Sequence, residues 1–130
     1  MAEYEALAKR AGGNATAQTG KSIVRATGRL RTHSMNKTEA EYAGRLQCDL
    51  MTREILWFRY EGVTLKLADD TRYTPDFAVL RSDGTLEMHE VKGGFMRDDS
   101  WVKLKVAAEQ FPFQFILARK QKGEWHVKQV

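Results

Sequence analysis

Cysteine is nearly absent from this 130-residue sequence, and long apolar runs are missing altogether. With Cys48 as the only cysteine, no intrachain disulfide can form and no cysteine-rich zinc site exists. We expect Cys48 to be a small buried hydrophobe. No segment approaches the roughly 18 uninterrupted apolar residues of a membrane span. The opening MAEYEALAKR also lacks the basic-then-apolar order of a secretion signal. We therefore expect a cytoplasmic protein without a membrane partner.

Acidic residues are scarce in the first part of the chain. Residues 1–37 contain only Glu3 and Glu5 against seven basic residues, a charge of +5, whereas the whole chain has a formal charge of +4. A basic segment attached to a near-neutral body suggests a polyanionic partner, most simply nucleic acid. A solvated tail is the alternative. The candidate phosphate-binding residues of this region are Lys21, Arg25, Arg29, Arg31 and Lys37.

The composition of residues 1–35 predicts a flexible basic arm. The stretch AGGNATAQTG is rich in Gly, Thr and Asn and lacks a sustained apolar period. Within it, 15-ATAQTGKS-22 ends like a phosphate-binding loop. However, Ala15 occupies the position of the first required glycine, and no apolar strand precedes the loop. We therefore expect no nucleotide cofactor.

One ordered domain is expected over residues 36–130. Apolar spacing predicts a helix over 38–54, and aromatic and β-branched residues predict a strand over 57–67, where Gly62 allows a bulge. A hairpin follows, and then a helix whose N-cap is supplied by the stretch 98-DDS-100 and which ends before Pro112. Two strands, over 113–120 and 124–130, complete the order α-β-β-β-α-β plus a last strand. This order predicts a mixed α/β fold.

The hairpin 73-YTPDFAVLRSDGTLEMHEVKGG-94 carries charges in unusual places. A three-residue loop favours Gly at its last position, as in Ser82-Asp83-Gly84. With that loop Asp76 faces Glu90, with the two Cβ atoms about 5 Å apart, and Lys92 shares their side of the sheet. A loop of two or four residues would shift this pairing.

The opposed carboxylates have two interpretations. Like charges placed directly opposite destabilise a hairpin, and a divalent cation between them removes that repulsion. Mg²⁺ or Mn²⁺ takes one or two carboxylates and keeps several waters, one of which it can activate against a phosphate. Lys92 could hold that water or screen the transition state. The alternative is a solvent-facing strand on which Glu90 and Lys92 form a surface pair of little value.

An acid on the first predicted helix is a further candidate. Glu39 starts a stripe that continues with apolar residues at i+4, i+7 and i+11. An inward-facing acid is costly unless it is paired or bound to metal. Glu39 can instead close a capping box with Asn36, but Thr38 and Glu41 form an equally good box. We expect Glu39, rather than Glu41, to complete the site.

Together these residues resemble the PD-(D/E)XK nuclease superfamily. An acid on the first helix, then Pro75-Asp76, then Glu90-Val91-Lys92 match its motif over about residues 36–120. More narrowly, TEAEYAGRL, YTPDF and HEVKGG are similar to small phage-encoded endonucleases, including enzymes that resolve Holliday junctions. The resemblance implies a restriction-endonuclease-like αβββαβ core.

The resemblance also implies a role for each matching residue. Asp76, Glu90 and the backbone carbonyl of Val91 would be metal ligands, and Lys92 the catalytic lysine. Glu39 would be a ligand or a water-orienting acid. On the second helix two lysines could contact a phosphate, although a solvated helix face is the other interpretation: Lys103 and Lys105.

The expected activity is therefore metal-dependent hydrolysis of DNA phosphodiester bonds with Mg²⁺ or Mn²⁺. The expected substrate is branched DNA such as a Holliday junction, cut in the cytoplasm of a bacterial host if the protein is phage-encoded. Because symmetric cutting of two strands needs two active sites, we expect a homodimer. The alternatives are a phage nuclease for linear or single-stranded DNA and a catalytically silent DNA-binding protein.

Overall fold

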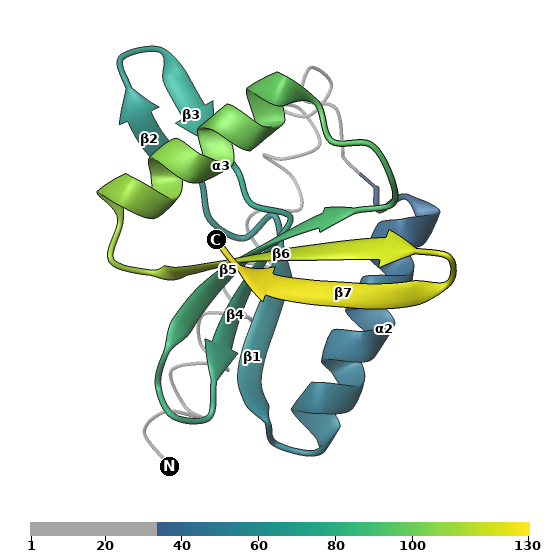
Figure 1. The fold of residues 1–130 in the computed structure, drawn as a ribbon. Coiled ribbons are helices and arrows are strands. Elements are labelled where there is room, and N and C mark those ends of the chain that lie inside the picture. Colours follow the sequence, from purple (N-terminus) through teal and green to yellow (C-terminus); the bar gives the residue numbers. More distant parts are fainter. Residues whose placement is uncertain (1–33) are drawn as a thin grey trace, which may run out of the picture. The chain divides into compact units, whose positions relative to one another are not determined.

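The computed structural model describes residues 34–130, which contain two helices and seven strands (Figure 1). The predicted arm residues Lys21, Arg25, Arg29 and Arg31 lie outside the described residues. Neither helix in the described part is long and apolar enough to cross a membrane. The elements in chain order are α2 (Lys37–Met51), β1 (Ile55–Tyr60), β2 (Leu65–Ala68), β3 (Thr71–Tyr73), β4 (Phe77–Arg81), β5 (Leu86–Lys92), α3 (Asp98–Gln110), β6 (Gln114–Gln121) and β7 (Glu124–Gln129).

Helix α2 begins at a capping box. The Asn36 side chain accepts a hydrogen bond from the backbone N–H of Glu39 at 2.8 Å, and the Glu39 carboxylate accepts one from the backbone N–H of Asn36 at 3.0 Å. Tyr42 and Leu46 are the buried residues of the helix. Cys48, which we expected to be buried, is exposed, because it lies two residues beyond Leu46 and so points away from the buried face.

Five strands form one mixed sheet in the order β1-β4-β5-β6-β7. Strands β5 and β6 pair in parallel, and α3 connects them, whereas the other neighbours in the sheet pair antiparallel. Residues Met35–Val130 form one compact unit. The predicted mixture of helices and strands is therefore confirmed at the level of fold class.

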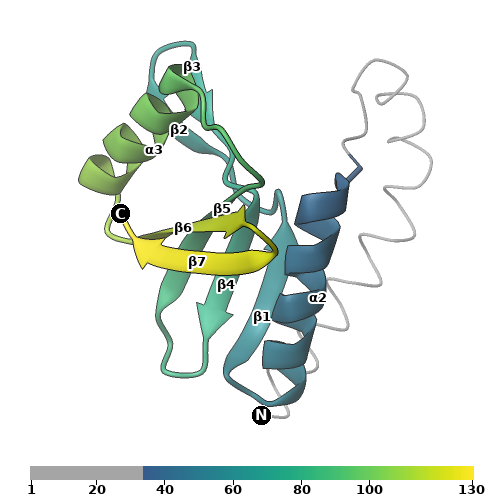
Figure 2. The same ribbon diagram turned by 45° about the vertical axis from the view of Figure 1, so that its right-hand side comes forward.

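The two helices cover opposite faces of this sheet (Figure 2). On the α2 face, Tyr42 and Leu46 pack with Phe77 and Val79 of β4 and with Val91 of β5. On the other face, α3 packs together with the small β2–β3 sheet over buried apolar residues of the main sheet. This second cluster contains Leu65, Tyr73, Ala78, Met88, Leu104, Ala107, Phe115 and Leu117. Successive residues of β4 and β5 thus alternate between two separate cores.

The predicted strand over 57–67 is wrong, because the structure has two strands there. Strand β1 ends at Tyr60, and Glu61 has a φ of 47°, a left-handed conformation that a continuous strand cannot contain. The chain then leaves the main sheet, and β2 pairs with β3 in a separate two-stranded sheet. The separate β2–β3 sheet places Tyr73, at the end of β3, in the core on the α3 face.

The predicted N-cap of the second helix is also wrong. Helix α3 starts at Asp98, so its N-cap is Arg97, which makes no capping hydrogen bond with its side chain. Asp98 and Asp99 lie within the first turn, where their charges complement the helix dipole. The helix ends at Gln110, before Pro112, as the sequence predicts.

Candidate metal centre

The register of the β4–β5 hairpin is the one expected from its three-residue loop. The backbone N–H of Arg81 donates to the carbonyl of Thr85 at 2.8 Å, and Gly84 has a φ of 91°. Farther from the loop, Phe77 pairs with His89. Continued by one residue, this register brings Asp76, which precedes Phe77, opposite Glu90, which follows His89. The ladder itself ends at Phe77, so the facing of Asp76 and Glu90 is an extension of its register; the effect of the Glu90 charge on the pKa of Asp76 shows that the two carboxylates are close.

Asp76 is held just before β4 by contacts of its backbone and its side chain. Its carbonyl accepts a hydrogen bond from the backbone N–H of Glu61 at 2.8 Å. Its Oδ2 accepts one from the backbone N–H of Val91 at 2.8 Å. Pro75, immediately before it, is fully buried and fixes the backbone at the entry to the strand. The carboxylate thus lies against the backbone of β5, next to Glu90.

Glu90 is buried, and both of its carboxylate oxygens have partners. The Tyr73 hydroxyl donates to Oε1 at 2.7 Å, and the Lys92 ammonium lies 3.2 Å from Oε2. Tyr73 is itself buried, whereas Lys92 is partly exposed. Burial of a carboxylate is costly unless it is hydrogen-bonded or paired. Tyr73 and Lys92 meet this requirement and fix the orientation of the Glu90 side chain.

The electrostatics of the site disfavour a negative charge on the Asp76 carboxylate. Burial, followed by the negative charge of Glu90, raises the pKa of Asp76 to about 8. Glu39 raises this pKa further, whereas the Val91 hydrogen bond and the charge of Lys92 lower it. Burial and the charge of Glu90 also raise the pKa of Tyr73, so that its hydroxyl remains a donor. One ammonium group does not neutralise the facing carboxylates.

Glu39 lies at the edge of this centre rather than within it. Its Oε1 accepts hydrogen bonds from the backbone N–H of Asn36 and, at 3.1 Å, from the Tyr60 hydroxyl. The capping box therefore uses Glu39, the alternative that we had judged less favourable. Glu41 is not free either, because it pairs with Lys120. Glu39 contributes its charge to the field at Asp76 but already has two donors.

The Thr38 side chain at the start of α2 lies close to Gly93 at the end of β5. A Cβ atom added at Gly93 would lie 2.9 Å from the Thr38 Oγ1, which is shorter than van der Waals contact allows. An alanine here would force the Thr38 side chain to shift, and the φ of Gly93 is not in the left-handed region. This contact explains how Glu39, one residue after Thr38, comes close enough to influence Asp76.

The donor set at the site suits a hard divalent cation. Asp76 and Glu90 offer carboxylate oxygens, and Mg²⁺ commonly uses one or two carboxylates while keeping several waters. Within residues 34–130, no group of three or more His, Cys, Asp or Glu side chains is arranged to hold a metal. A cation here would therefore have two carboxylates and would rely on backbone oxygen, such as the Val91 carbonyl, and on water. The raised pKa of Asp76 fits this arrangement, because a cation would offset the repulsion from Glu90.

The predicted DNA-contacting lysines of the described part lie away from the two carboxylates. Lys37 is exposed at the first position of α2. The Lys103 ammonium donates to the carbonyl of Arg72 at 3.2 Å, which ties α3 to β3. Lys105 lies over the ring of Trp101, 5.9 Å from its centroid. The structure does not bring these three lysines together with Asp76 and Glu90.

Two tyrosines of the site were not predicted. Tyr73 holds Glu90, and Tyr60 holds Glu39. Tyr73 belongs to the quoted hairpin stretch, but its role depends on the separate β2–β3 sheet, which periodicity did not reveal. The only feature of the local sequence that could have indicated this role is the position of Tyr73, three residues before the candidate acid Asp76.

Comparison with known proteins found no relative on which a function could be based. No family model, no curated protein and no solved structure matches the chain. The assignment of the centre therefore rests on its own geometry.

Proposed function

We propose that the protein is a metal-dependent endodeoxyribonuclease whose catalytic centre contains Asp76, Glu90 and Lys92. The observation that carries the proposal is the closeness of the Asp76 and Glu90 carboxylates, expected from the hairpin register continued by one residue, with the Lys92 ammonium beside Glu90. An ordinary hairpin avoids facing like charges. A protein that only binds DNA has no use for them, because the phosphate backbone is itself negative.

The surrounding elements support the same proposal. A helix, an antiparallel hairpin and a helical crossover to a parallel strand are the parts expected of a restriction-endonuclease-like core. The two strands β2 and β3 are an addition to the expected αβββαβ order. The motif residues lie at the end of the hairpin next to that crossover. We propose that this core belongs to the PD-(D/E)XK superfamily.

Each residue of the centre has a role that its contacts allow. Asp76 and Glu90 would hold Mg²⁺ or Mn²⁺ by carboxylate oxygens. The chemistry supplied by the ion, when bound, is activation of a water and neutralisation of charge on the phosphate. The Lys92 ammonium, 3.2 Å from Glu90, lies where it can orient the attacking water and offset the charge of the phosphate. Tyr73 keeps Glu90 in place, and Glu39 remains a candidate for orienting water at the edge of the site.

Cleavage of three labelled DNAs tests the proposal. A four-way junction, a matched linear duplex and a single strand are incubated with Mg²⁺, with Mn²⁺ or with EDTA. The enzymes are the wild type, Asp76→Ala and the control Asp69→Ala, whose carboxylate is 98% exposed in the β2–β3 turn. We expect metal-dependent cutting by the wild type and Asp69→Ala only, with the junction cut preferentially. No cutting by the wild type under either metal, with DNA binding retained, would identify a DNA-binding protein instead.

The basic residues of the first 33 positions would strengthen binding to DNA phosphates without reading bases. Deletion of residues 1–33 should therefore weaken binding and reduce its dependence on salt concentration. Unchanged affinity and an unchanged salt slope would contradict this role. Because a junction has two strands to cut, we also propose a homodimer, which light scattering at the assay concentration would test.

A further inference from the structure

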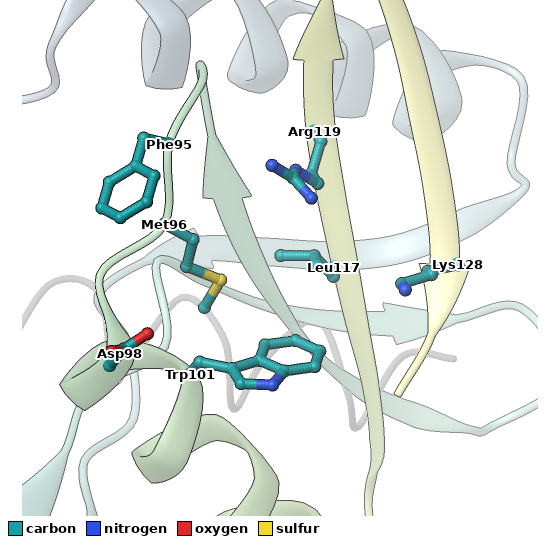
Figure 3. Close-up of a pocket in the computed structure, with 7 residues that line it drawn as sticks. All are labelled: Phe95, Met96, Asp98, Trp101, Leu117, Arg119 and Lys128. Atoms are coloured by element: carbon teal, nitrogen blue, oxygen red, sulfur yellow. The ribbon is translucent and has the colours of Figure 1, made fainter.

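A hollow of about 270 Å³ lies between strand β6, strand β7 and the start of α3 (Figure 3). Strand β6 forms its floor, and the segment after β5, the start of α3 and strand β7 form its walls. Its volume lies just below the range of about 300–1,000 Å³ that is usual for small-molecule sites. A single planar ring system suits it better than a large cofactor. The lining residues are Phe95, Met96, Asp98, Trp101, Leu117, Arg119 and Lys128.

The sheet register places this hollow one strand away from the carboxylates. Glu90 pairs with Leu117 and Lys92 pairs with Arg119 across the parallel β5–β6 ladder. Paired residues point to the same face, and neighbouring strands lie about 4.8 Å apart. A DNA strand advances about 3.4 Å per nucleotide along a duplex. A nucleotide in the hollow would therefore be one or two positions from a phosphate at Asp76 and Glu90.

The hollow combines apolar surface with two cations and one acid, Asp98, which in the part of the chain that the structure describes is not ion-paired with either cation. Among the described residues, neither Arg119 nor Lys128 is paired with an acid. The Arg119 guanidinium donates to the carbonyl of Gly94 at 3.1 Å, and its Nε is the one buried side-chain N or O within residues 34–130 without a hydrogen-bond partner. Figure 3 shows Arg119, Lys128 and Trp101 around the same space. An anionic group is the natural partner for the two cations.

Trp101 gives the hollow an aromatic wall that a base can use. Its indole is partly exposed, and the Lys128 ammonium lies 5.8 Å from its ring centroid. A base stacked on the indole would displace the Lys128 side chain and leave its ammonium available for the adjoining phosphate. Phe95, which is 86% exposed at the rim, supplies a second ring where the hollow opens.

We infer that this hollow holds one unpaired nucleotide of the DNA substrate, with its base on Trp101 and its phosphate at Arg119 and Lys128. A base within a duplex is already stacked on both sides and cannot use an aromatic wall. The pocket therefore selects DNA with unpaired positions next to the cut, such as branch points, flaps or single strands. The inference rests on the proposed nuclease function for its biological meaning, but base binding can be measured without cleavage.

The test uses oligonucleotides in which 2-aminopurine replaces an unpaired base or, in a matched duplex, a paired one. Binding is measured in EDTA, so that no cutting occurs. With the wild type we expect fluorescence quenching for the unpaired probe only. Trp101→Ala should remove the quenching and weaken binding of the unpaired DNA roughly 10-fold, with less than about twofold change for the duplex. Trp101→Phe should restore most of both effects.

Two exposed positions keep the test independent of folding. Lys128→Ala and Phe95→Ala should each weaken binding of the unpaired probe severalfold without lowering the thermal midpoint. Val102→Ala, at an exposed position of the same helix outside this hollow, should have no effect. Equal loss of duplex and unpaired binding in Trp101→Ala, or unchanged binding in all pocket variants, would overturn the inference. Saturable binding of a free nucleoside monophosphate with no preference for unpaired DNA would overturn it as well.

The same experiment separates this inference from the nuclease proposal. Asp76→Ala should quench the unpaired probe like the wild type while failing to cut with Mg²⁺. Quenching by a wild type that cuts no DNA would contradict the nuclease and leave the nucleotide pocket in place. Metal-dependent cutting by a wild type that does not quench the unpaired probe, with the same preference for unpaired substrates in Trp101→Ala, would contradict the pocket and leave the nuclease in place.

Discussion

Strand β5 buries ionisable side chains on both of its faces, and the two sets differ in how their charges are matched. On the α2 face, His89 Nε2 lies 2.8 Å from the Glu87 carboxylate and His89 Nδ1 lies 2.7 Å from the Tyr42 hydroxyl. Because a carboxylate only accepts, Nε2 carries the proton, and in a neutral ring Nδ1 then accepts from Tyr42. Arg81, 3.9 Å from Glu87, adds a positive charge. Every polar group of this network has a complementary partner.

On the α3 face, the same strand presents Glu90 to Asp76. Two carboxylates share one ammonium there, and the pKa of Asp76 rises to about 8 because of burial and the charge of Glu90. A structural network could have avoided this repulsion, as the neighbouring network does. The comparison shows that the charges on the α2 face are matched, whereas those of Asp76 and Glu90 on the α3 face repel each other, and this repulsion is what the proposed cation would relieve. Each prediction below perturbs one face and uses the other as a reference.

The largest expected effect is the loss of cleavage when either facing carboxylate is replaced. Asp76→Asn and Glu90→Gln should each lower the cleavage rate by at least about 100-fold, because a cation that contributes several kcal/mol to the transition state is lost. Circular dichroism should show both variants folded. A cleavage rate within about threefold of the wild type would show that these carboxylates are not catalytic.

Replacing the histidine on the opposite face should affect stability instead. His89→Ala leaves Glu87 and Tyr42 buried without their partner, so we expect a loss of about 2–4 kcal/mol in the free energy of unfolding. Tyr42→Phe removes only one hydrogen bond and should cost about 1 kcal/mol. Urea denaturation measures both. A His89→Ala variant less than about 1 kcal/mol below the wild type would mean that the network does not support the fold.

The stability of the metal-free protein should depend on pH through Asp76. Its pKa is raised from 3.8 to about 8, so between these values the folded protein retains a proton that the unfolded chain has released. Stability therefore falls as pH rises through this window. At pH 8 in EDTA, Asp76→Asn should be more stable than the wild type by several kcal/mol, up to about 5 kcal/mol, and the difference should nearly vanish near pH 4.

Added Mg²⁺ gives the control for that pH dependence. At pH 8 the ion should raise the free energy of unfolding of the wild type but not that of Asp76→Asn. The comparison of the two proteins removes the contribution of all other titrating groups. Identical pH profiles for both proteins in EDTA would show that Asp76 titrates normally.

A smaller effect is expected when the support of Glu90 is removed. Tyr73→Phe deletes the hydroxyl that donates to Glu90 at 2.7 Å while retaining the buried ring. Loss of an outer hydrogen bond to a metal ligand typically weakens metal affinity about 10-fold or more. We expect a loss of roughly 10-fold in Mn²⁺ affinity with a similar loss in cleavage. Tyr60→Phe removes the hydroxyl that donates to Glu39 and should lower the Mn²⁺ affinity less than Tyr73→Phe. A larger loss of Mn²⁺ affinity in Tyr60→Phe than in Tyr73→Phe would show that Glu39, rather than Glu90, is the more important metal ligand.

The smallest effect concerns the contact that joins the start of α2 to the end of β5. Gly93→Ala places a methyl group 2.9 Å from the Thr38 hydroxyl oxygen, so we expect a cost of about 1 kcal/mol. Thr38→Ala in the same chain should restore most of that stability, which a double-mutant cycle measures. An equal cost of Gly93→Ala in both backgrounds would show that the contact is not responsible.

The local chemistry of the hairpin was sufficient to predict its register. Ser82-Asp83-Gly84 fixed the loop length, and the two-residue period of the strands then determined that Asp76 faces Glu90. The same alternation explains why His89 contacts Tyr42 on the opposite face of the sheet. These features depend on residues close together in the sequence, where turn geometry decides the outcome.

Features that depend on distant contacts were missed. The strand over 57–67 is interrupted at Glu61, and the resulting small sheet carries Tyr73 to Glu90, 17 residues away in sequence. Glu39, which forms the capping box at α2, also accepts a hydrogen bond from the distant Tyr60, and nothing in the sequence indicates this contact. Arg119, which lines the hollow, lies next to Lys92 because β6 pairs in parallel with β5. Periodicity alone carries no information about such pairings.

Direct titration of Mn²⁺ tests the central claim that Asp76 and Glu90 form a cation site. Isothermal titration calorimetry at pH 8 would compare the wild type with Asp76→Asn, Glu90→Gln and the exposed control Asp69→Asn. The account predicts one ion per chain for the wild type and the control, with affinity reduced at least about 10-fold in the other two. Equal binding by all four proteins, or no binding by the wild type at millimolar Mn²⁺, would contradict it.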